Sequence, residues 1–359
     1  MYNFEPMGFA TFTNYLFVPG SDNQQEGKLY ELEEASGFEK NSLVLIPYTN
    51  PQKKSTKPRY LKISRVAKIP PQSSTAELNP KFHLRAKTSR QDYLKKVKQL
   101  KQHIQEGNIY EINFCVQFFA ENIAIDPLSV FLRLHALSKA PYSALLKLGS
   151  QYIISSSPEL FLKKVGNLLS TKPIKGTIRR GVTKDEDERL KDELFYSIKE
   201  RTENVMAVDV ARNDLSIIAA KGSVHVNKLY NIESFETVHQ MVSSVSCLLK
   251  ENTSFENILD ATFPMASMTG APKNRAMQLI DEFEDIARGP YSGAMGLIDE
   301  NEDFELSVII RSIFYDEAAK TLSINVGSAI TYLSDSEEEY KECLLKAKAL
   351  LTALNAQLP

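Results

Sequence analysis

The residues with the clearest chemical potential are a lysine and a glutamate at the two ends of one predicted β-hairpin. Segments 160–165 and 168–173 read as its strands, with a Gly-Asn turn between them. Lys175 follows the hairpin, and in a dry pocket burial would lower its pKa and leave a neutral, nucleophilic amine. Glu159 precedes the hairpin and could donate a proton as a general acid. Taken alone, the commoner explanation is an exposed lysine and a glutamate at a strand end.

Two pairs of glutamates could hold a metal ion. Glu200 and Glu203 are three residues apart on one predicted helix, and Glu339 and Glu342 have the same spacing on another, so each pair shares a helix face. If the pairs face each other, they form an oxygen-rich site that suits Mg²⁺ better than zinc or copper. The alternative is two ordinary solvated helix faces. Lys346 lies one turn beyond Glu342, where it could meet an anionic ligand or pair with that glutamate.

Other positions could contact an anion or could belong to the core. Arg311 follows an apolar run, and a guanidinium at the end of a buried strand needs a partner such as a ligand carboxylate. Thr269 opens a segment that leads into a predicted helix, whose free N–H groups could bind a carboxylate or could simply start the helix. His239 lies among apolar residues, where a histidine is more often a core residue than a catalytic one. Gly327 could permit a close backbone approach or could only relieve crowding in a strand.

The elements that must position these residues follow an irregular order. We expect helices at 89–107, from 126 onward, and at 183–209, 237–248, 255–262, 273–283 and 337–354. We expect strands at 9–18, 42–48, 60–66, 108–120, 142–148, 151–154, 216–218, 224–229, 291–298, 304–315 and 321–329. Because strands and helices do not alternate regularly, the pattern favours an α+β fold of layered antiparallel or mixed sheets flanked by helices. We place a mainly β region at 1–88, packed on a larger domain at 89–354.

Composition narrows the class of protein. The chain has 359 residues, with 43 Lys and Arg against 45 Asp and Glu, a net charge of −2 that argues against a nucleic-acid-binding protein. We find no apolar run of membrane-spanning length and no signal-peptide pattern, so we expect no membrane partner and a cytoplasmic location. Cys115, Cys247 and Cys343 are widely spaced and indicate free thiols in a reducing compartment.

Several motifs, in one order along the chain, resemble those of the chorismate-utilising enzymes, the family of anthranilate, aminodeoxychorismate, isochorismate and salicylate synthases. The likeness covers about 89–351 and implies the layered fold of anthranilate synthase component I. The motifs are SSPE at 156–159, PIKGT at 173–177, ENVM at 203–206, RND at 212–214, TVHQ at 237–240, TGAPK at 269–273, RGPYSG at 288–293 and EYKE at 339–342.

Two positions separate the branches of that family. The lysine of PIKGT, Lys175, resembles component I of the aminodeoxychorismate synthases, whereas the other branches usually have alanine there. Glu111 falls where the water-adding members place a lysine base and the amine-adding members a glutamine. The absence of lysine argues against isochorismate chemistry, and the glutamate is a departure from the amine-adding pattern. The alternatives are an anthranilate synthase component I and a non-catalytic scaffold.

The resemblance implies a mechanism and a set of binding residues. Mg²⁺ on Glu203 and Glu342, supported by Glu200 and Glu339, would hold the ring carboxylate of chorismate. Lys175 would attack C2 and displace the C4 hydroxyl with Glu159 as general acid, after which ammonia would add at C4 and expel the lysine. The enolpyruvyl carboxylate would be bound by Arg311, Tyr291, Lys346 and backbone near Gly327, while His239 and Thr269 would orient the ring.

The resemblance also implies a partner. None of the three cysteines lies in a glycine-rich turn that would suit the nucleophile of a glutaminase. Ammonia would therefore come from a separate glutamine amidotransferase subunit.

Overall fold

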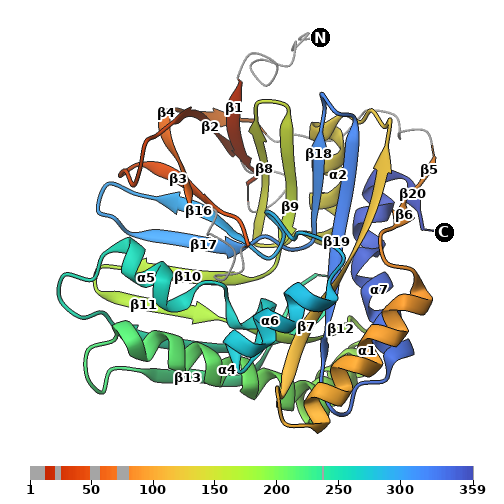
Figure 1. The fold of residues 1–359 in the computed structure, drawn as a ribbon. Helices are drawn as coiled ribbons and strands as arrows, with labels where there is room; N and C mark the ends of the chain where they lie inside the picture. Colours follow the sequence, from red (N-terminus) through yellow and green to blue (C-terminus); the bar gives the residue numbers. More distant parts are fainter. Residues whose placement is uncertain (1–12, 21–25, 49–56, 71–80, 237, 359) are drawn as a thin grey trace.

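Most strands of the protein belong to one long antiparallel sheet (Figure 1). The computed structural model describes residues 13–20, 26–48, 57–70, 81–236 and 238–358. The 18 strands of the sheet are β1 Asn14–Val18, β2 Gly27–Glu34, β3 Ser42–Ile46, β4 Arg59–Ile69, β6 Arg85–Ala86, β7 Glu111–Glu121, β8 Tyr142–Leu148, β9 Gln151–Ser157, β10 Leu160–Val165, β11 Leu168–Lys172, β12 Ile174–Arg179, β13 His225–Ser234, β14 Val238–Leu248, β15 Gly270–Ala271, β16 Ala294–Ile298, β17 Phe304–Val308, β18 Ser312–Asp316 and β19 Thr321–Ile330. Two short strands, β5 Phe82–His83 and β20 Ala356–Gln357, form a separate parallel pair.

Strand β4 joins the sheet into one strip. From one end the pairing runs β7, β19, β18, β9, β8, β1, β2, β4, and it continues through β3, β16, β17, β10, β11 and β14. Short β6 and β15 pair with β7 at one end, and β12 and β13 pair with β14 at the other. Because β4 pairs with β2 through 61–69 and with β3 through 59–62, the strip has two halves that meet at this strand.

The two halves face each other and are covered by helices on their outer sides. One apolar cluster lies between them, with Leu16 and Leu146 from the first half and Leu45 and Met295 from the second. A larger cluster lies between the first half and α1 Arg90–Gln105, α2 Pro127–Ser138, α6 Lys273–Phe283 and α7 Ser336–Leu354. A third lies between the second half and α4 Ile198–Ile218 and α5 Phe255–Thr262, while α3 Lys184–Tyr196 contacts β12 to β14. The result is a helix, sheet, sheet, helix layering, as the α+β prediction expected.

Two of the places where the chain crosses between the two halves are neighbours. The first crossing leads from β9 to β10 through Pro158 and Glu159, and the second leads from β17 to β18 through residues up to Arg311. Each crossing is hydrogen-bonded to a strand that flanks the other crossing. Val308 N of β17 donates to Glu159 O at 3.0 Å, and Ser156 N of β9 donates to Arg311 O at 3.2 Å. Two of the predicted site residues therefore lie where the halves separate.

Side-chain caps fix where most helices begin. Ser89 Oγ accepts from the Asp92 N–H, Asp126 caps α2, Thr183 caps α3 and Asp335 caps α7, each satisfying N–H groups that the first helical turn leaves free. These starts were predicted to within a residue or two, because Ser, Thr and Asp before an apolar periodic run are strong signals.

Two predicted elements are wrong. Residues 238–248, predicted as a helix, form strand β14, which pairs with β11, β12 and β13 and is buried along most of its length. A strand buried on both faces has no alternation to distinguish it from a helix. Residues 216–218, predicted as a strand, are the last turn of α4.

Other predictions placed the right type of element with the wrong bounds. The helix expected at 183–209 is two helices, α3 and α4, which meet at Ser197. The strand expected at 304–315 is β17 and β18, because Arg311 has a left-handed backbone, with φ +51°. Strand β2 was not foreseen, and residues 9–12 of the first expected strand lie outside the described residues.

The N-terminal strands share the sheet with the rest of the chain. β1 pairs with β8, and β3 pairs with β16, so strands from both sides of residue 88 are hydrogen-bonded neighbours. A division at residue 88 thus remains a prediction about folding units. None of the helices in the described ranges has the length and apolar character needed to cross a lipid bilayer.

Candidate active site

The acidic part of the site starts from a break between two helices. The Ser197 backbone is extended, with φ −62° and ψ 115°, and its Oγ accepts the Glu200 N–H at 3.3 Å. Ser197 therefore ends α3 and caps α4 in a new register. In that register Lys199 and Glu203 are four residues apart and share a face, with Lys199 Nζ 3.8 Å from Glu203 Oε1.

The structure brings the two glutamate pairs together around Lys199. Its Nζ lies 2.8 Å from Glu339 Oε1 and 3.7 Å from Glu342 Oε2, so one ammonium from α4 contacts two carboxylates of α7 as well as Glu203. Burial lowers the pKa of Lys199, but the surrounding carboxylates outweigh burial and the net effect is a raised pKa. Lys199 was not predicted as a site residue, although its spacing of four from Glu203 could have indicated it.

The carboxylates differ in their surroundings. Burial raises the pKa of Glu203 to about 8 and raises that of Glu200 as well. Burial also raises the pKa of Glu342, but Lys346, whose Nζ is 2.7 Å from Glu342 Oε1, and Lys199 lower it further, to about 2.

The carboxylates of Glu200, Glu203, Glu339 and Glu342 are chemically suitable ligands for a hard divalent cation, although they are not arranged as a complete coordination shell. Glu203 Oε1 and Glu339 Oε2 are buried and have no hydrogen-bond partner among the described residues, which is costly for a carboxylate unless a cation contacts it. Across the described ranges, no three Asp, Glu, His or Cys side chains are already drawn together as a ligand shell. The positive charge among Glu203, Glu339 and Glu342 is supplied by the Lys199 ammonium. The binding of magnesium therefore stays a prediction.

Lys175 lies next to this cluster and is paired with Glu111. Its side chain is 7% exposed and that of Glu111 2%, and Lys175 Nζ donates a hydrogen bond to Glu111 Oε1. Burial lowers the pKa of Lys175, but the charges of Glu111, Glu203 and Glu159 outweigh it and raise the pKa above its ordinary value. The prediction of a neutral resting amine is therefore wrong, because a buried lysine with carboxylate partners keeps its proton.

Glu159 has the properties of a general acid. It is buried at the crossing between the sheet halves, and burial raises the pKa of its carboxyl to about 7, although Ser267 and Lys175 oppose the shift. A carboxyl with this pKa is substantially protonated at neutral pH and can donate its proton there.

The guanidinium of Arg311 is unpaired within the part of the chain that the structure describes. No described residue forms a hydrogen bond or salt bridge with its guanidinium, and burial lowers its pKa against the opposing influence of Tyr291, Glu342 and Glu159. Tyr291 is itself buried, and burial raises its pKa well above the ordinary value. A planar cation held beside a buried phenol and with free N–H groups is suited to bind a carboxylate of a ligand.

Gly327 and Lys346 contact each other directly. Lys346 Nζ donates to Gly327 O at 2.7 Å, which ties α7 to β19 beside the glutamates. A Cβ on Gly327 would lie 2.7 Å from Cys115 Sγ and 2.9 Å from Asn113 Oδ1, so only glycine fits this close approach of β19 and β7.

His239 and Thr269 are engaged with the protein rather than free for a ligand. His239 Nδ1 lies 2.8 Å from Ser234 Oγ and Nε2 lies 2.9 Å from Asp187 Oδ1, so both ring nitrogens have partners. Thr269 Oγ1 donates to Met265 O at 3.1 Å. Their predicted roles in orienting a ring find no support in these contacts.

A buried pair of Arg288 and Glu284, not among the predicted site residues, links β7 to the segments that flank it. Arg288 Nη2 lies 2.6 Å from Glu284 Oε1, and the same guanidinium donates to Asn113 O and Met268 O. Glu284 also accepts the Cys115 N–H at 2.9 Å. Together these bonds hold β7, α6 and the turn before β15 in one arrangement.

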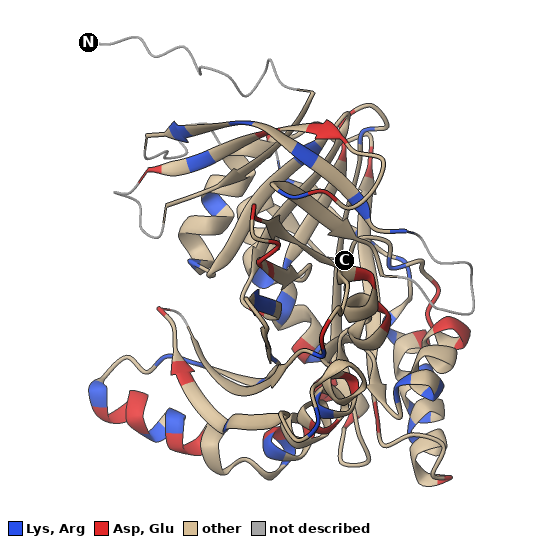
Figure 2. Cartoon of the chain, turned by 90° about the vertical axis from the view of Figure 1, so that its left-hand side faces the viewer, with Lys and Arg blue, Asp and Glu red and all other residues tan. Residues whose placement is uncertain are grey.

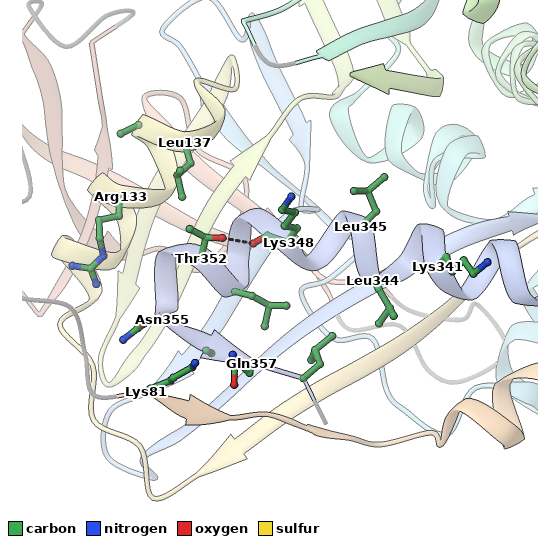
Figure 3. A pocket seen from close by; sticks show the side chains of 14 residues that line it. Lys81, Arg133, Leu137, Lys341, Leu344, Leu345, Lys348, Thr352, Asn355 and Gln357 are labelled. Carbon is green, nitrogen blue, oxygen red and sulfur yellow. Dashed lines mark hydrogen bonds between the residues drawn. The ribbon is translucent and has the colours of Figure 1, made fainter. Parts of the chain in front are cut away.

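A separate groove lies on the other side of α7. Figure 3 shows it between α2, α7 and the C-terminal segment, with an apolar floor that includes Leu344 and a rim that includes Lys81, Lys341 and Lys348. Its volume is about 960 Å³, and none of the predicted site residues lines it. Elsewhere acidic and basic residues are interspersed over the ribbon (Figure 2), which agrees with the near-neutral net charge.

The sequence matches a family of enzymes over nearly its whole length. Residues 8–352 match the family described as chorismate binding enzyme. A probable chloroplastic aminodeoxychorismate synthase of Oryza sativa subsp. japonica is 42% identical over 264 residues, 73% of this chain and 29% of the relative. The aminodeoxychorismate synthase component 1 of Bacillus subtilis (strain 168) is 36% identical over 72% of this chain and 54% of the relative. An anthranilate synthase component 1 of Haloarcula marismortui is also 36% identical, over 75% of this chain and 55% of the relative.

The chain thus spans about a third of the plant relative and about half of the bacterial and archaeal ones. Solved structures share the fold at lower identity. The menaquinone-specific isochorismate synthase MenF of Escherichia coli has a TM-score of 0.80 at 16% identity, covering 98% of this chain and 92% of its own. The isochorismate synthase DhbC of Bacillus anthracis, described as putative and specific for 2,3-dihydroxybenzoate, has a TM-score of 0.76 at 21% identity, covering 95% and 96%.

Proposed function

The chain belongs to the family of chorismate-binding enzymes, and we propose that it is a component I aminodeoxychorismate synthase that converts chorismate and ammonia to 4-amino-4-deoxychorismate. The observation that carries the proposal is Lys175, a buried amine beside Glu111 and within the electrostatic influence of Glu159 and Glu203. A lysine here resembles component I of the aminodeoxychorismate synthases, whereas the other branches usually have alanine. The aminodeoxychorismate synthases among the relatives support the same branch.

The proposed reaction uses Lys175 as a nucleophile and Glu159 as an acid. The Lys175 amine forms a bond to C2 of the ring while the C4–O bond breaks, and Glu159 gives its proton to the departing hydroxide. Ammonia then forms a bond to C4 as the C2–N bond to lysine breaks, which regenerates the amine. Two allylic displacements replace one direct substitution at C4.

The remaining residues bind and orient the substrate in this proposal. Arg311 pairs with the enolpyruvyl carboxylate through its free N–H groups, beside Tyr291. Lys346 holds α7 against β19 through Gly327 O. Glu203, Glu339 and Glu342, with Glu200 next to them, would hold magnesium, which when bound supplies positive charge for the ring carboxylate.

We also propose that a separate glutamine amidotransferase delivers the ammonia. The name component 1 of the Bacillus subtilis relative supports a second component. Cys115, Cys247 and Cys343 are all buried free thiols, which supports a reducing compartment such as the cytoplasm as the place of action.

Incubation with chorismate, Mg²⁺ and an excess of ammonium near neutral pH, followed by mass analysis of the products, tests the proposal. The expected product is aminodeoxychorismate, and Lys175→Ala should abolish its formation. Anthranilate as the sole product would replace the proposal with an anthranilate synthase, and unchanged chorismate would favour a non-catalytic scaffold. Substantial amination by Lys175→Ala would mean that ammonia attacks the ring directly.

A further inference from the structure

The pairing of Lys175 with Glu111 raises the question of how Lys175 loses its proton before it attacks the ring. An ammonium has no lone pair, so Lys175 cannot attack a carbon until its proton leaves. Both side chains are nearly inaccessible to solvent, which removes bulk water as a ready acceptor. The proton must therefore pass to a group inside the site.

Glu111 is the group in the right position. It is the one carboxylate among the described residues to which Lys175 Nζ donates a hydrogen bond. The other carboxylates that act electrostatically on Lys175 are Glu159 from the crossing between the sheet halves and the acidic cluster of Glu200, Glu203 and Glu342, none of which accepts a hydrogen bond from Lys175 among the described contacts. Glu159 must keep its own proton for the departing hydroxide, and Glu203 belongs to the acidic cluster around Lys199.

The backbone holds Glu111 in place. Glu111 is the first residue of β7 and pairs with Ala271 of β15, and the preceding residue, Tyr110, donates its N–H to Ala271 O at 2.7 Å. A Cβ at Gly270 would lie 2.2 Å from Glu111 O, so glycine permits this close approach.

The backbone of Lys175 is fixed in a comparable way. The pairing of β12 with β14 shifts register between Ile174 and Thr177, which frees Lys175 from regular pairing. The next residue, Gly176, has φ +88°, and a Cβ there would lie 2.9 Å from Glu200 Oε2. The proton acceptor, Glu111, thus lies on β7 beside Gly270, and the proton donor, Lys175, lies on β12 beside Gly176. Both glycines permit close backbone approaches at these positions.

We infer that Glu111 is a catalytic base that takes the proton of Lys175 before attack and returns it when the lysine leaves. The inference rests on the proposed function.

In the first step a proton moves from Lys175 Nζ to Glu111, and the neutral amine bonds to C2 as hydroxide departs from C4 with the proton of Glu159. In the second, ammonia bonds to C4 and the lysine leaves as a neutral amine. Glu111 then reprotonates it, and the new C4 ammonium returns a proton to Glu159, so the net change is chorismate plus ammonia to product plus water.

The test measures formation of the lysine adduct alone. The protein is mixed with chorismate and Mg²⁺ without ammonia, and intact-protein mass follows the adduct, which carries chorismate less one water. Glu111→Gln should form the adduct about 100-fold more slowly than the unmodified protein at neutral pH, the usual contribution of a positioned base. Glu111→Asp, which keeps a carboxylate on a shorter arm, should recover part of the rate. Glu121→Gln, at the exposed far end of the same strand, is the matched control and should leave the rate unchanged.

If Glu111 had a purely electrostatic role, the rate of adduct formation in Glu111→Gln would change in the opposite direction. Removing its charge would then release the Lys175 proton more easily, and Glu111→Gln would form the adduct as fast as or faster than the unmodified protein, which would overturn the inference. If Glu111→Gln fails to fold, an unchanged adduct rate in Glu111→Asp overturns the inference and a reduced rate supports it. Failure of the proposed function looks different, because the unmodified protein itself would then form neither adduct nor aminated product.

Discussion

At the scale of single residues, the candidate site combines buried and partly exposed charges of opposite sign. Lys175, Lys199 and Arg311 are cations in or beside a buried acidic cluster, and only Arg311 lacks a hydrogen-bonded or ion-paired partner among the described side chains. Two of the cations thus have carboxylates that can serve as proton acceptors or counter-charges. The third remains available for a ligand anion.

The pH dependence of turnover should report Glu159. Because burial raises its pKa to about 7, the carboxyl carries its proton below that pH and loses it above. We expect kcat to fall with rising pH above about 7, by tenfold per unit, as the acid form disappears. Glu159→Gln should lower kcat by about 100-fold or more and should lack this alkaline fall. Glu305→Gln, an exposed partner of Lys163 on β17, serves as the control and should keep the profile of the unmodified protein.

Lys199 should compete with magnesium for the same carboxylates. Lys199→Met removes the ammonium from among Glu203, Glu339 and Glu342 and should lower the free energy of unfolding by about 2 kcal/mol without metal, less than for a fully buried pair because the side chain is 33% exposed. Added Mg²⁺ should then raise the Tm of the variant more than that of the unmodified protein. Lys341→Met, on an exposed turn of α7, is the control. Equal Mg²⁺ effects in all three proteins would show that the carboxylates do not bind the ion.

At the scale of elements, the sequence predicted the helices that have local start signals and apolar periodicity. It missed the elements whose type depends on pairing with distant strands. Helices α5 and α6 were predicted with their observed bounds, because the Ser254 cap and the apolar periodicity of 255–262 and 273–283 are local. Strand β14 was mistaken for a helix because only its partners make it a strand, β11 and β12 on one edge and β13 on the other. The two glutamate pairs could be predicted from spacing, whereas the Lys175–Glu111 pair joins residues 64 positions apart and has no local signature.

The contact between β15 and β7 should be sensitive to a single added methyl group. Gly270→Ala would place Cβ 2.2 Å from Glu111 O, and the glycine has φ +151°. We expect a loss of about 2–3 kcal/mol in the free energy of unfolding, because such an overlap forces the strands apart. Urea denaturation measures it, with Gly37→Ala, where nothing lies within 4 Å, as the control. A stability equal to that of the control would mean that β15 can shift away without cost.

At the scale of the whole molecule, the continuous sheet predicts one cooperative folding unit. Strands β1 and β3 supply the partners of β8 and β16, and residues such as Leu16 and Leu45 fill the layer between the sheet halves. We expect a single thermal transition for the whole chain and no comparable transition for a chain that starts at Ser89, because its strand edges and inner core would be exposed. Calorimetry checks both, and an equally cooperative transition in the shorter chain would support a separate folding unit at 89–354.

The crossing at Arg311 has a consequence for how this enzyme could change its ligand. Its left-handed backbone carries the chain from one half of the sheet to the other, while Glu342 and Glu159 act electrostatically on its guanidinium, so connectivity and the proposed recognition of a carboxylate depend on different parts of one residue. A glycine there would adopt the turn at no steric cost and would remove the guanidinium that we propose binds an anion. A β-branched residue would sacrifice the turn as well. Selection could therefore exchange one ligand charge for another at this position without rerouting the chain, provided that the replacement tolerates a positive φ.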